Sequence, residues 1–279
     1  MVKTKTFISL LFFSIFILHS LSFSTDTFIY GGCTQQTFTS TSPYEFNLNS
    51  LLTSLVNSAT YTSYNNFTIV ASNPNDIAYG LYQCRGDLSM PDCASCVSRA
   101  VSRAGDICPT TCGGVVQLEG CYVKYDNVKF LGVEDKTVVL KKCGSSIGYD
   151  PNTRDAVLAG LVGSGGYFRV GGSGQVKGTV QCIGDLSFLE CQDCVSEAVR
   201  RLRSDCPAAD YGDMFLAKCY ARYSTGGAGG GHAYSKSHGK SDNDNEKTFA
   251  IIIGLLAAVA ILIIFLAFLR RICEGHQGK

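Results

Sequence analysis

The residues with the clearest chemistry in this chain are its 14 cysteines, because thiols form disulfides, bind metals or act as nucleophiles. The segment from Gln83 to Tyr125 recurs without a gap, 98 positions later, as Gln181 to Tyr223. Five cysteines recur with it, as the pairs Cys84 and Cys182, Cys93 and Cys191, Cys96 and Cys194, Cys108 and Cys206, and Cys121 and Cys219. One offset shared by five cysteines indicates two copies of a small cysteine-framed domain.

The compartment decides what these cysteines do. Residues 1–24 have the basic start, the apolar run and the small final residues of a secretory signal peptide. Secreted cysteines form disulfides. Each domain has six framework cysteines once Cys33 and Cys143 join the two recurring sets. Six cysteines allow 15 pairings, and spacing alone does not choose among them. A zinc site is rejected because the C-x8-C-x2-C spacing is not one that zinc sites use, and a thioredoxin-type site lacks its flanking residues.

Two cysteines fall outside this framework. Cys112 corresponds to Asp210 in the second copy, so it is a buried free thiol, an alternative partner for Cys33 or a link to another chain. Cys273 follows a predicted membrane helix, where a cysteine is either S-acylated or an unmodified cytosolic thiol.

The predicted domains lack the residues that most catalysis requires. No histidine occurs between Thr25 and Thr225, which excludes Ser-His-Asp and Cys-His catalysis and histidine-based metal sites there. Asp87 and Asp185 are candidates for a glycosidase pair, but each lies in a repeated Gly-Asp-Leu-Ser before a predicted helix, where a turn or cap role explains it. We therefore predict a binding module with no enzymatic activity, cofactor or metal. The net charge of +1, without basic runs in the domains, gives no sign of nucleic-acid binding.

The elements that position the cysteines are two helices and several strands in each domain. Apolar residues spaced three and four apart predict helices at Leu48–Val56, Cys93–Ala104, Val157–Val162 and Cys191–Leu202. A capping box from Ser187 to Glu190 opens the last of these. Two segments rich in β-branched, aromatic and apolar residues, Val115–Tyr125 and Met214–Tyr223, are predicted strands. The expected class is α+β, with two tandem disulfide-rich domains (25–135 and 136–225), each an antiparallel sheet packed by two helices.

The end of the chain predicts a membrane anchor. Phe249–Leu269 contains no charged residue and would span ~31 Å as a helix, about the thickness of a hydrocarbon core. Arg270 and Arg271 follow it, which places the tail (270–279) in the cytoplasm and the two domains outside, a type I topology. Residues 226–248 are polar and glycine-rich, as in a flexible stalk. Asn66-Phe67-Thr68 is a glycosylation sequon, and we expect a glycan on Asn66.

The motif C-x8-C-x2-C followed by C-x12-C, present twice, resembles the plant stress-antifungal domain, also called the ginkbilobin-homologous or cysteine-rich secretory repeat. Two such domains with one membrane helix and a tail too short for a kinase resemble the plasmodesmata-located proteins. This resemblance implies a disulfide pairing: Cys33–Cys108, Cys84–Cys93, Cys96–Cys121, Cys143–Cys206, Cys182–Cys191 and Cys194–Cys219.

A lectin of the same family binds mannose through an Asn, an Arg and a Glu at fixed distances from its cysteines. The positions that match hold Thr34, Val115 and Asp126 in the first domain. In the second domain they hold Gly144, Asp213 and Ser224. Because neither copy keeps the amide or the guanidinium donor, we expect this mannose-binding activity to be absent.

The resemblance implies a non-enzymatic plasma-membrane protein at plasmodesmata that modulates cell-to-cell trafficking, in part through callose. Its ectodomain would lie in the apoplast, and it would act by homo- or hetero-association with other plasmodesmal membrane proteins and be used by viral movement proteins. Two alternatives stay open: a lectin-type receptor for a cell-wall polysaccharide, and an apoplastic thiol sensor that acts through Cys112.

Overall fold

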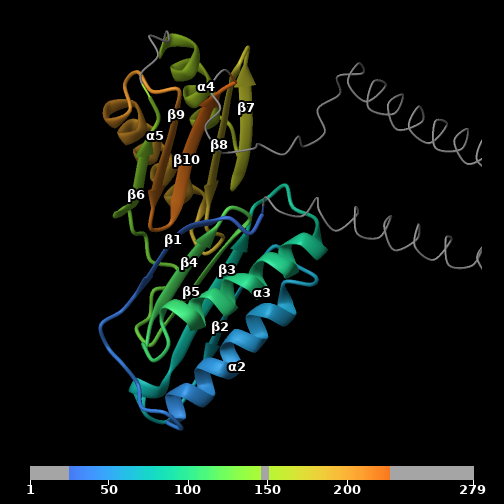
Figure 1. Cartoon of the computed structure of the whole chain (residues 1–279), viewed down its shortest axis with the longest axis vertical. Coiled ribbons are helices and arrows are strands. Elements are labelled where there is room, and N and C mark those ends of the chain that lie inside the picture. Colours follow the sequence, from blue (N-terminus) through green and yellow to red (C-terminus); the bar gives the residue numbers. More distant parts are fainter. Residues whose placement is uncertain (1–24, 146–150, 227–279) are drawn as a thin grey trace, which may run out of the picture. The chain divides into compact units, whose positions relative to one another are not determined.

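The computed structural model describes residues 25–145 and 151–226, and each repeat in it contains a five-stranded antiparallel sheet (Figure 1). The strand orders are β1-β4-β5-β3-β2 and β6-β9-β10-β8-β7, so the two sheets have the same topology. The first sheet consists of β1 (Phe28–Cys33), β2 (Tyr64–Ile69), β3 (Ala78–Cys84), β4 (Gly114–Leu118) and β5 (Cys121–Asp126). The second consists of β6 (Val138–Cys143), β7 (Phe168–Ser173), β8 (Val176–Cys182), β9 (Tyr211–Leu216) and β10 (Cys219–Thr225). The sheets and helices confirm the predicted α+β class.

Two helices cover one face of each sheet. They are α2 (Pro43–Ser58) and α3 (Met90–Ile107) in the first repeat, and α4 (Pro151–Gly163) and α5 (Phe188–Asp205) in the second. A single 3-10 turn, η2 (Pro74–Asp76), precedes β3. The Ser89 hydroxyl caps α3 by accepting the Asp92 N–H at 3.3 Å, and Ser187 forms the predicted capping box with Glu190 at α5. Each cap stabilises its helix by about 1 kcal/mol.

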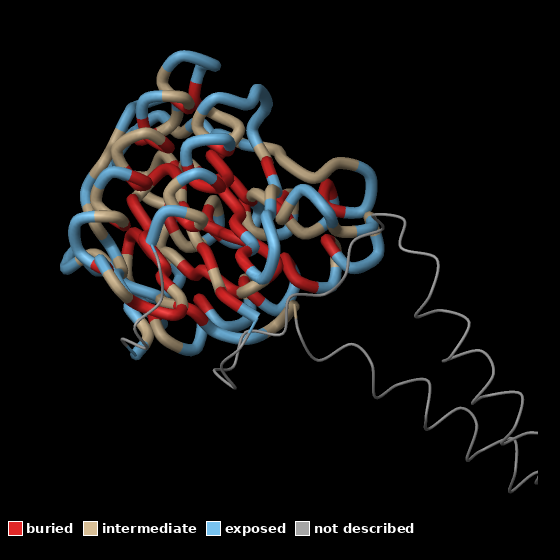
Figure 2. The backbone as a smooth tube through the Cα atoms, turned by 90° about the horizontal axis from the view of Figure 1, so that it is seen from above, coloured by how far each residue is buried: buried red, intermediate tan, exposed pale blue. Residues whose placement is uncertain are grey.

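The core of each repeat lies between its helices and its sheet, where Figure 2 shows the buried residues concentrated. The first core contains three fully buried helix side chains, Leu51 and Leu55 of α2 and Val97 of α3. The second core contains Leu158 of α4 and Leu202 of α5, which are also fully buried. These side chains recur at helical spacing because one stripe of each helix faces its sheet.

Disulfides fasten these helices to the sheets. Cys93 and Cys96 lie on the inner face of α3, and they bond to β3 and β5 respectively. The six disulfides are Cys33–Cys108, Cys84–Cys93, Cys96–Cys121, Cys143–Cys206, Cys182–Cys191 and Cys194–Cys219, the same pairs that the resemblance implies. One helix per repeat is thus held at both of its neighbouring strands.

The segments predicted as single strands, Val115–Tyr125 and Met214–Tyr223, are hairpins instead. β4 and β5 turn at Glu119 and Gly120, and β9 and β10 turn at Ala217 and Lys218. Each turn has only two residues, so it leaves the apolar pattern of the flanking strands almost uninterrupted. The correction matters because Glu119 and Lys218 make contacts from these turns.

Within residues 25–145 and 151–226, no helix is long and apolar enough to cross a membrane. The predicted signal peptide, stalk, membrane helix and cytoplasmic tail, with Cys273, lie outside the described residues.

Candidate interaction site at the junction of the two repeats

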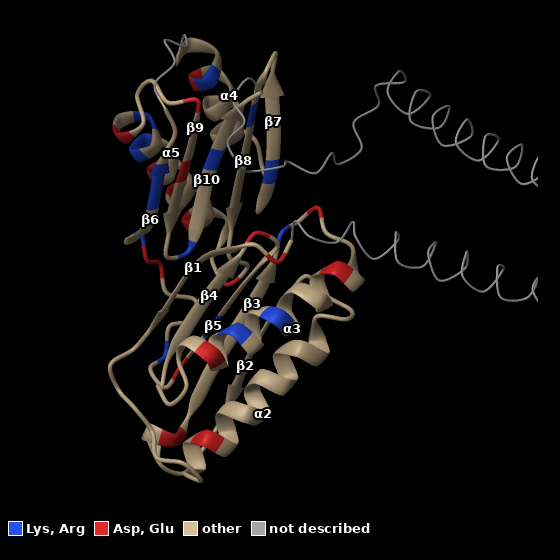
Figure 3. Cartoon of the chain, in the orientation of Figure 1, with Lys and Arg blue, Asp and Glu red and all other residues tan. Residues whose placement is uncertain are grey.

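An ion network joins the two repeats. The Arg222 guanidinium on β10 contacts Glu119 of the β4–β5 turn through Nη1 and Asp213 of β9 through Nε, both at 2.7 Å. The same Glu119 carboxylate accepts from Arg85 at 3.4 Å. Figure 3 shows the acidic residue of β9 and the basic residue of β10 on these two strands. Burial opposes the charge of Arg222, but Asp213 and Glu119 outweigh it and raise the pKa of Arg222, so the guanidinium stays protonated.

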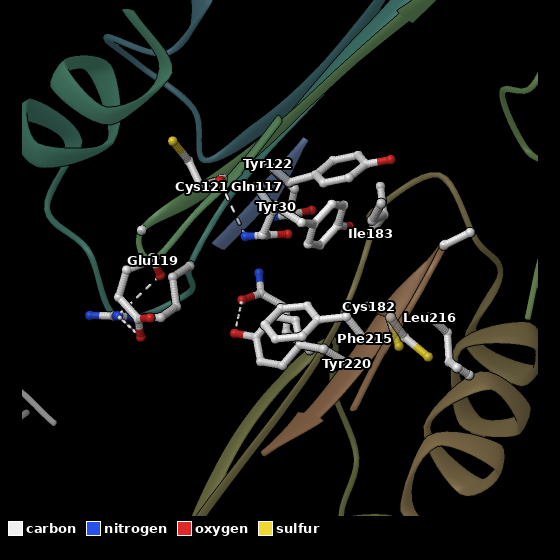
Figure 4. A pocket seen from close by; sticks show the side chains of 16 residues that line it. Tyr30, Gln117, Glu119, Cys121, Tyr122, Cys182, Ile183, Phe215, Leu216 and Tyr220 are labelled. Carbon is white, nitrogen blue, oxygen red and sulfur yellow. Dashed lines mark hydrogen bonds and ion pairs between the residues drawn. The ribbon is translucent and has the colours of Figure 1, made fainter. Parts of the chain in front are cut away.

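Two glutamines at equivalent positions of the repeats meet at this junction. Gln181 Nε2 donates to the Cys84 carbonyl at 2.8 Å, and the Gly184 N–H donates to Gln83 Oε1 at 2.9 Å. Tyr220 Oη in turn donates to Gln181 Oε1 at 3.1 Å (Figure 4). Every one of these groups is buried or half-buried, so each hydrogen bond satisfies a polar group that would be costly to leave unpaired.

The repeats approach each other at the glycine of each Gly-Asp-Leu-Ser motif. A Cβ added to Gly86 would lie 2.6 Å from the Phe168 ring carbon Cγ, and one added to Gly184 would lie 2.8 Å from Tyr64 Cγ. Tyr30 and Phe215 add an edge-to-face ring contact with centroids 5.8 Å apart. Glycine is therefore required at these two positions by the packing of one repeat on the other.

The two aspartates of these motifs pair with cations. Asp87 contacts Arg85 at 2.6 Å, while Asp185 pairs with Lys218, and both of these last side chains are almost fully buried. Asp185 also accepts the Gly132 N–H at 3.0 Å, and Lys218 donates to the Phe130 carbonyl at 3.0 Å. A turn or cap role was predicted for both aspartates. Both lie in turns, which the Leu88 N–H closes on the Arg85 carbonyl at 3.1 Å and the Leu186 N–H closes on the Ile183 carbonyl at 3.3 Å. Each aspartate is also a counter-ion, and Asp185 binds the linker between the repeats.

The junction encloses a cavity of about 30 Å³, lined by residues of both repeats. This volume is the space of about one water molecule, so no sugar ring fits there. In the parts of the chain that the structure describes, no three His, Cys, Asp or Glu side chains are grouped as metal ligands. The junction is therefore an interface between the two repeats that sets how one packs on the other.

The positions that match the mannose site of the lectin lie on or next to strands of the two sheets. In the first repeat, Thr34 and Asp126 flank Gly113, while Val115 pairs with Lys124 across the β4–β5 ladder. In the second repeat Asp213 is held by Arg222, and Ser224 lies opposite Tyr211. Gly144 packs against Asp210 and Tyr211.

Cys112 is a buried free thiol with 3% of its surface exposed. Tyr44 donates its hydroxyl to the Cys112 carbonyl, and burial together with the nearby Asp126 raises the pKa of the thiol. A reactive thiol requires a lowered pKa and access, so this environment argues against a thiol sensor. Asn66, the predicted glycosylation site, is exposed on the edge strand β2.

Comparison with known proteins places this fold in a class. The family model described as salt stress response/antifungal matches residues 32–128 and 142–226, one match for each repeat. In the solved tandem DUF26 ectodomain of the cysteine-rich receptor-like protein PDLP5 from Arabidopsis thaliana, 45% of residues are identical. That match has a TM-score of 0.69 and covers 72% of this chain and 100% of the other. A second solved tandem ectodomain, that of PDLP8, has 38% identity at the same TM-score and coverage.

Relatives that match most of the chain identify the subgroup of this family. Plasmodesmata-located protein 7 of Arabidopsis thaliana is 66% identical over 92% of this chain and 87% of the relative. Plasmodesmata-located protein 6 of the same plant is 54% identical over 92% of both chains. The chain belongs to the salt stress response/antifungal family, within its tandem-repeat group of plasmodesmata-located proteins.

Proposed function

We propose that this protein is a non-enzymatic type I membrane protein of plasmodesmata that modulates cell-to-cell trafficking and channel permeability, in part through callose. The observation that carries the proposal is the 66% identity to plasmodesmata-located protein 7 over 92% of the chain. The solved tandem ectodomain of PDLP5 aligns with only 72% of the chain, so the similarity to full-length relatives extends beyond the two repeats.

The two repeats face the apoplast in this proposal and the tail from Arg270 faces the cytoplasm. Phe249–Leu269 anchors the protein and takes part in targeting. The ectodomain acts by contacts with other proteins, a role supported by the junction of its repeats, where a buried Glu119–Arg222 ion pair joins them and the enclosed cavity of about 30 Å³ is too small for a sugar. Its partners are other copies or other plasmodesmal membrane proteins, and viral movement proteins are a further class to test.

The proposal is tested by imaging the full chain with a fluorescent tag at its C-terminus in leaf epidermis, beside a callose stain. Paired puncta across shared walls that coincide with callose are expected, and spread of a mobile fluorescent protein between cells should change with the amount of the protein. A matched control replaces Phe249–Leu269 with an apolar helix of the same length and unrelated sequence, which keeps the anchor but removes any targeting signal. A uniform plasma-membrane signal from the native chain contradicts the proposal and turns attention to binding of wall polysaccharides.

A further inference from the structure

A second hollow lies on the helical face of the second repeat, away from the junction. It is an open groove of about 530 Å³ between α4 and α5. Its apolar lining is aliphatic, from Ala159 and Val162 of α4 and Val199 of α5. The polar residues that line the groove are Arg200, Arg203, Ser196 and Ser204, all on α5. No aromatic ring lines the groove, so it lacks the flat surface on which a sugar stacks. Its volume is large enough for one bulky apolar side chain and the residues next to that side chain in the partner.

The groove has an excess of positive charge. Four arginines share two carboxylates there: Arg200 and Arg201 pair with Glu197, while Arg154 and Arg203 contact Asp155. Hydrogen bonds from Arg200 and Arg201 lower the pKa of Glu197 to about 2, so this carboxylate is already ionised and cannot add further negative charge. The nearby Asp205 is paired with Lys141. Four arginines against two carboxylates leave a net charge of about +2 around the groove, and each arginine contacts one of these carboxylates.

The first repeat has different residues at the same positions of its helix. With the constant offset of 98, Arg200 corresponds to Ser102, Arg203 to Gly105 and Ser204 to Asp106. The basic rim is thus particular to the second repeat. A role in the fold common to both repeats does not explain it.

The first repeat carries an apolar side chain that the fold leaves uncovered. Phe46, in the first turn of α2, is 65% exposed, while its neighbours Tyr44 and Leu48 are buried in the core. Glu45 precedes it, and the adjacent Asn47 donates to the Asp76 carbonyl at 2.8 Å, which fixes η2 and its acidic residue beside this turn. Figure 3 shows acidic residues around this end of α2. Phe46 is therefore an exposed ring that follows Glu45 in the chain and lies on the turn of α2 to which Asn47 holds the Asp76 backbone.

The two repeats also differ in total charge. Residues 25–135 contain 10 Asp and Glu against 5 Lys and Arg, a net charge of −5, whereas residues 136–225 contain 9 against 11, a net charge of +2. From the shape and charge of the two features we propose that Phe46 of one copy of this protein inserts into the α4–α5 groove of a second copy. Glu45 and Asp76 then face Arg200 and Arg203 of that copy.

This contact joins two different surfaces, so it is heterologous. Each copy keeps a free Phe46 at one surface and an open groove at the other, and such contacts build open chains unless the rotation closes a ring. The exposed Phe46 and the open groove show that a copy does not fill its own groove. This contact is one way in which the ectodomain could associate as the proposed function requires. It rests on the proposed function only for the location, the plasmodesma, at which the two copies would meet.

The test uses the purified tandem ectodomain, residues 25–226, because the equivalent unit of two relatives was crystallised without the rest of the chain. This choice also removes any association through Phe249–Leu269. Sedimentation velocity up to about 1 mM, near the effective concentration that tethering provides, should show species that grow beyond a dimer. Salt at about 1 M, where the Debye length is about 3 Å, should weaken the association.

Two surface variants give the decisive comparison. F46S removes the ring and A159F fills the groove, and each alone should weaken self-association at least about tenfold, the effect of about 1.4 kcal/mol. Mixed together they should form a 1:1 pair and nothing larger, since one copy still has the groove and the other still has the ring. F188S is the matched control, because Phe188 is 51% exposed on α5 outside both features, and it should behave as the native protein.

Three results overturn the inference: a native ectodomain that stays monomeric to about 1 mM, an F46S variant that associates as strongly as the native protein, or a mixture of F46S and A159F that forms no pair. These results concern the contact alone. The F46S variant of the full chain can also be imaged in leaf epidermis. If it still forms plasmodesmal puncta with normal callose while its ectodomain no longer self-associates, the location is independent of the contact.

Discussion

The ion pair between Glu119 and Arg222 makes the sharpest prediction about stability. Both side chains are mostly buried, with 16% and 13% of their surface exposed. Removing one partner of a fully buried pair costs about 3–5 kcal/mol, and an exposed pair is worth about 0–1 kcal/mol. E119Q also weakens the contact with Arg85, but Arg222 keeps Asp213 at 2.7 Å. We therefore expect E119Q to lower the free energy of unfolding by about 2 kcal/mol.

The assay is urea unfolding of the ectodomain with its disulfides intact, together with the midpoint of thermal unfolding. For a chain of this size a loss of about 2 kcal/mol lowers that midpoint by about 4–8 °C. A double-mutant cycle with R222Q separates the pair from its surroundings and should give a coupling energy of about 1–2 kcal/mol.

The matched control is E134Q. Glu134 pairs with Lys136 at 3.1 Å, but 33% and 30% of these side chains are exposed. Its loss should cost less than about 0.5 kcal/mol. An E119Q effect no larger than that of E134Q would refute the reasoning, since the pair that joins the repeats would then be no more stabilising than a surface contact.

Three further predictions concern single repeats. Cys96–Cys121 and Cys84–Cys93 are both buried but close loops with separations of 25 and 9 residues. In urea, C96A/C121A should therefore lose about 0.9 kcal/mol more than C84A/C93A, and the reverse order contradicts the loop-entropy account. Native Cys112 should react with a thiol reagent at least about 100-fold slower than the unfolded ectodomain does, because burial and Asp126 raise its pKa. Equal rates would show that the thiol is accessible. Arg200 and Arg201 lower the pKa of Glu197 from 4.5 to about 2, so its stabilisation is complete above about pH 5 and is lost as the pH falls towards 2. The stability difference between the native protein and E197Q, at most about 1 kcal/mol at this surface site, should therefore be smaller at pH 3 than at pH 6. A constant difference would count against this pairing.

Most of the architecture within a repeat follows from local patterns in the chain. The constant offset of the cysteines indicates the duplication, and helical spacing together with a cap places α3 and α5. The duplication is readable because one offset recurs for five cysteines, and the helices are readable because each pattern depends on residues at most a few turns apart. The hairpins at Glu119 and Lys218 were missed because a two-residue turn interrupts the apolar pattern too briefly.

Local patterns of this kind do not predict most of the candidate site. Glu119 and Arg222 are 103 positions apart, and Gln181 bonds to Cys84 from 97 positions away. The duplication does not help to find them, because Glu119 corresponds to Ala217 and Arg222 to Lys124. The repeated glycines, Gly86 and Gly184, were the available signal. Each was interpreted as part of a turn, although each also marks a close approach of the other repeat.

Composition, a repeated cysteine spacing and short-range patterns are enough to specify the two-repeat cysteine frame, the α+β class and the lack of histidine in the predicted domains. Three properties become visible only in the folded chain: the surfaces through which the repeats join, the buried pair of Asp185 and Lys218, and the apolar groups that stay exposed. Burial is the physical reason: whether Phe46 or Val199 is covered depends on neighbours that the fold brings from distant parts of the chain, and no local pattern encodes them.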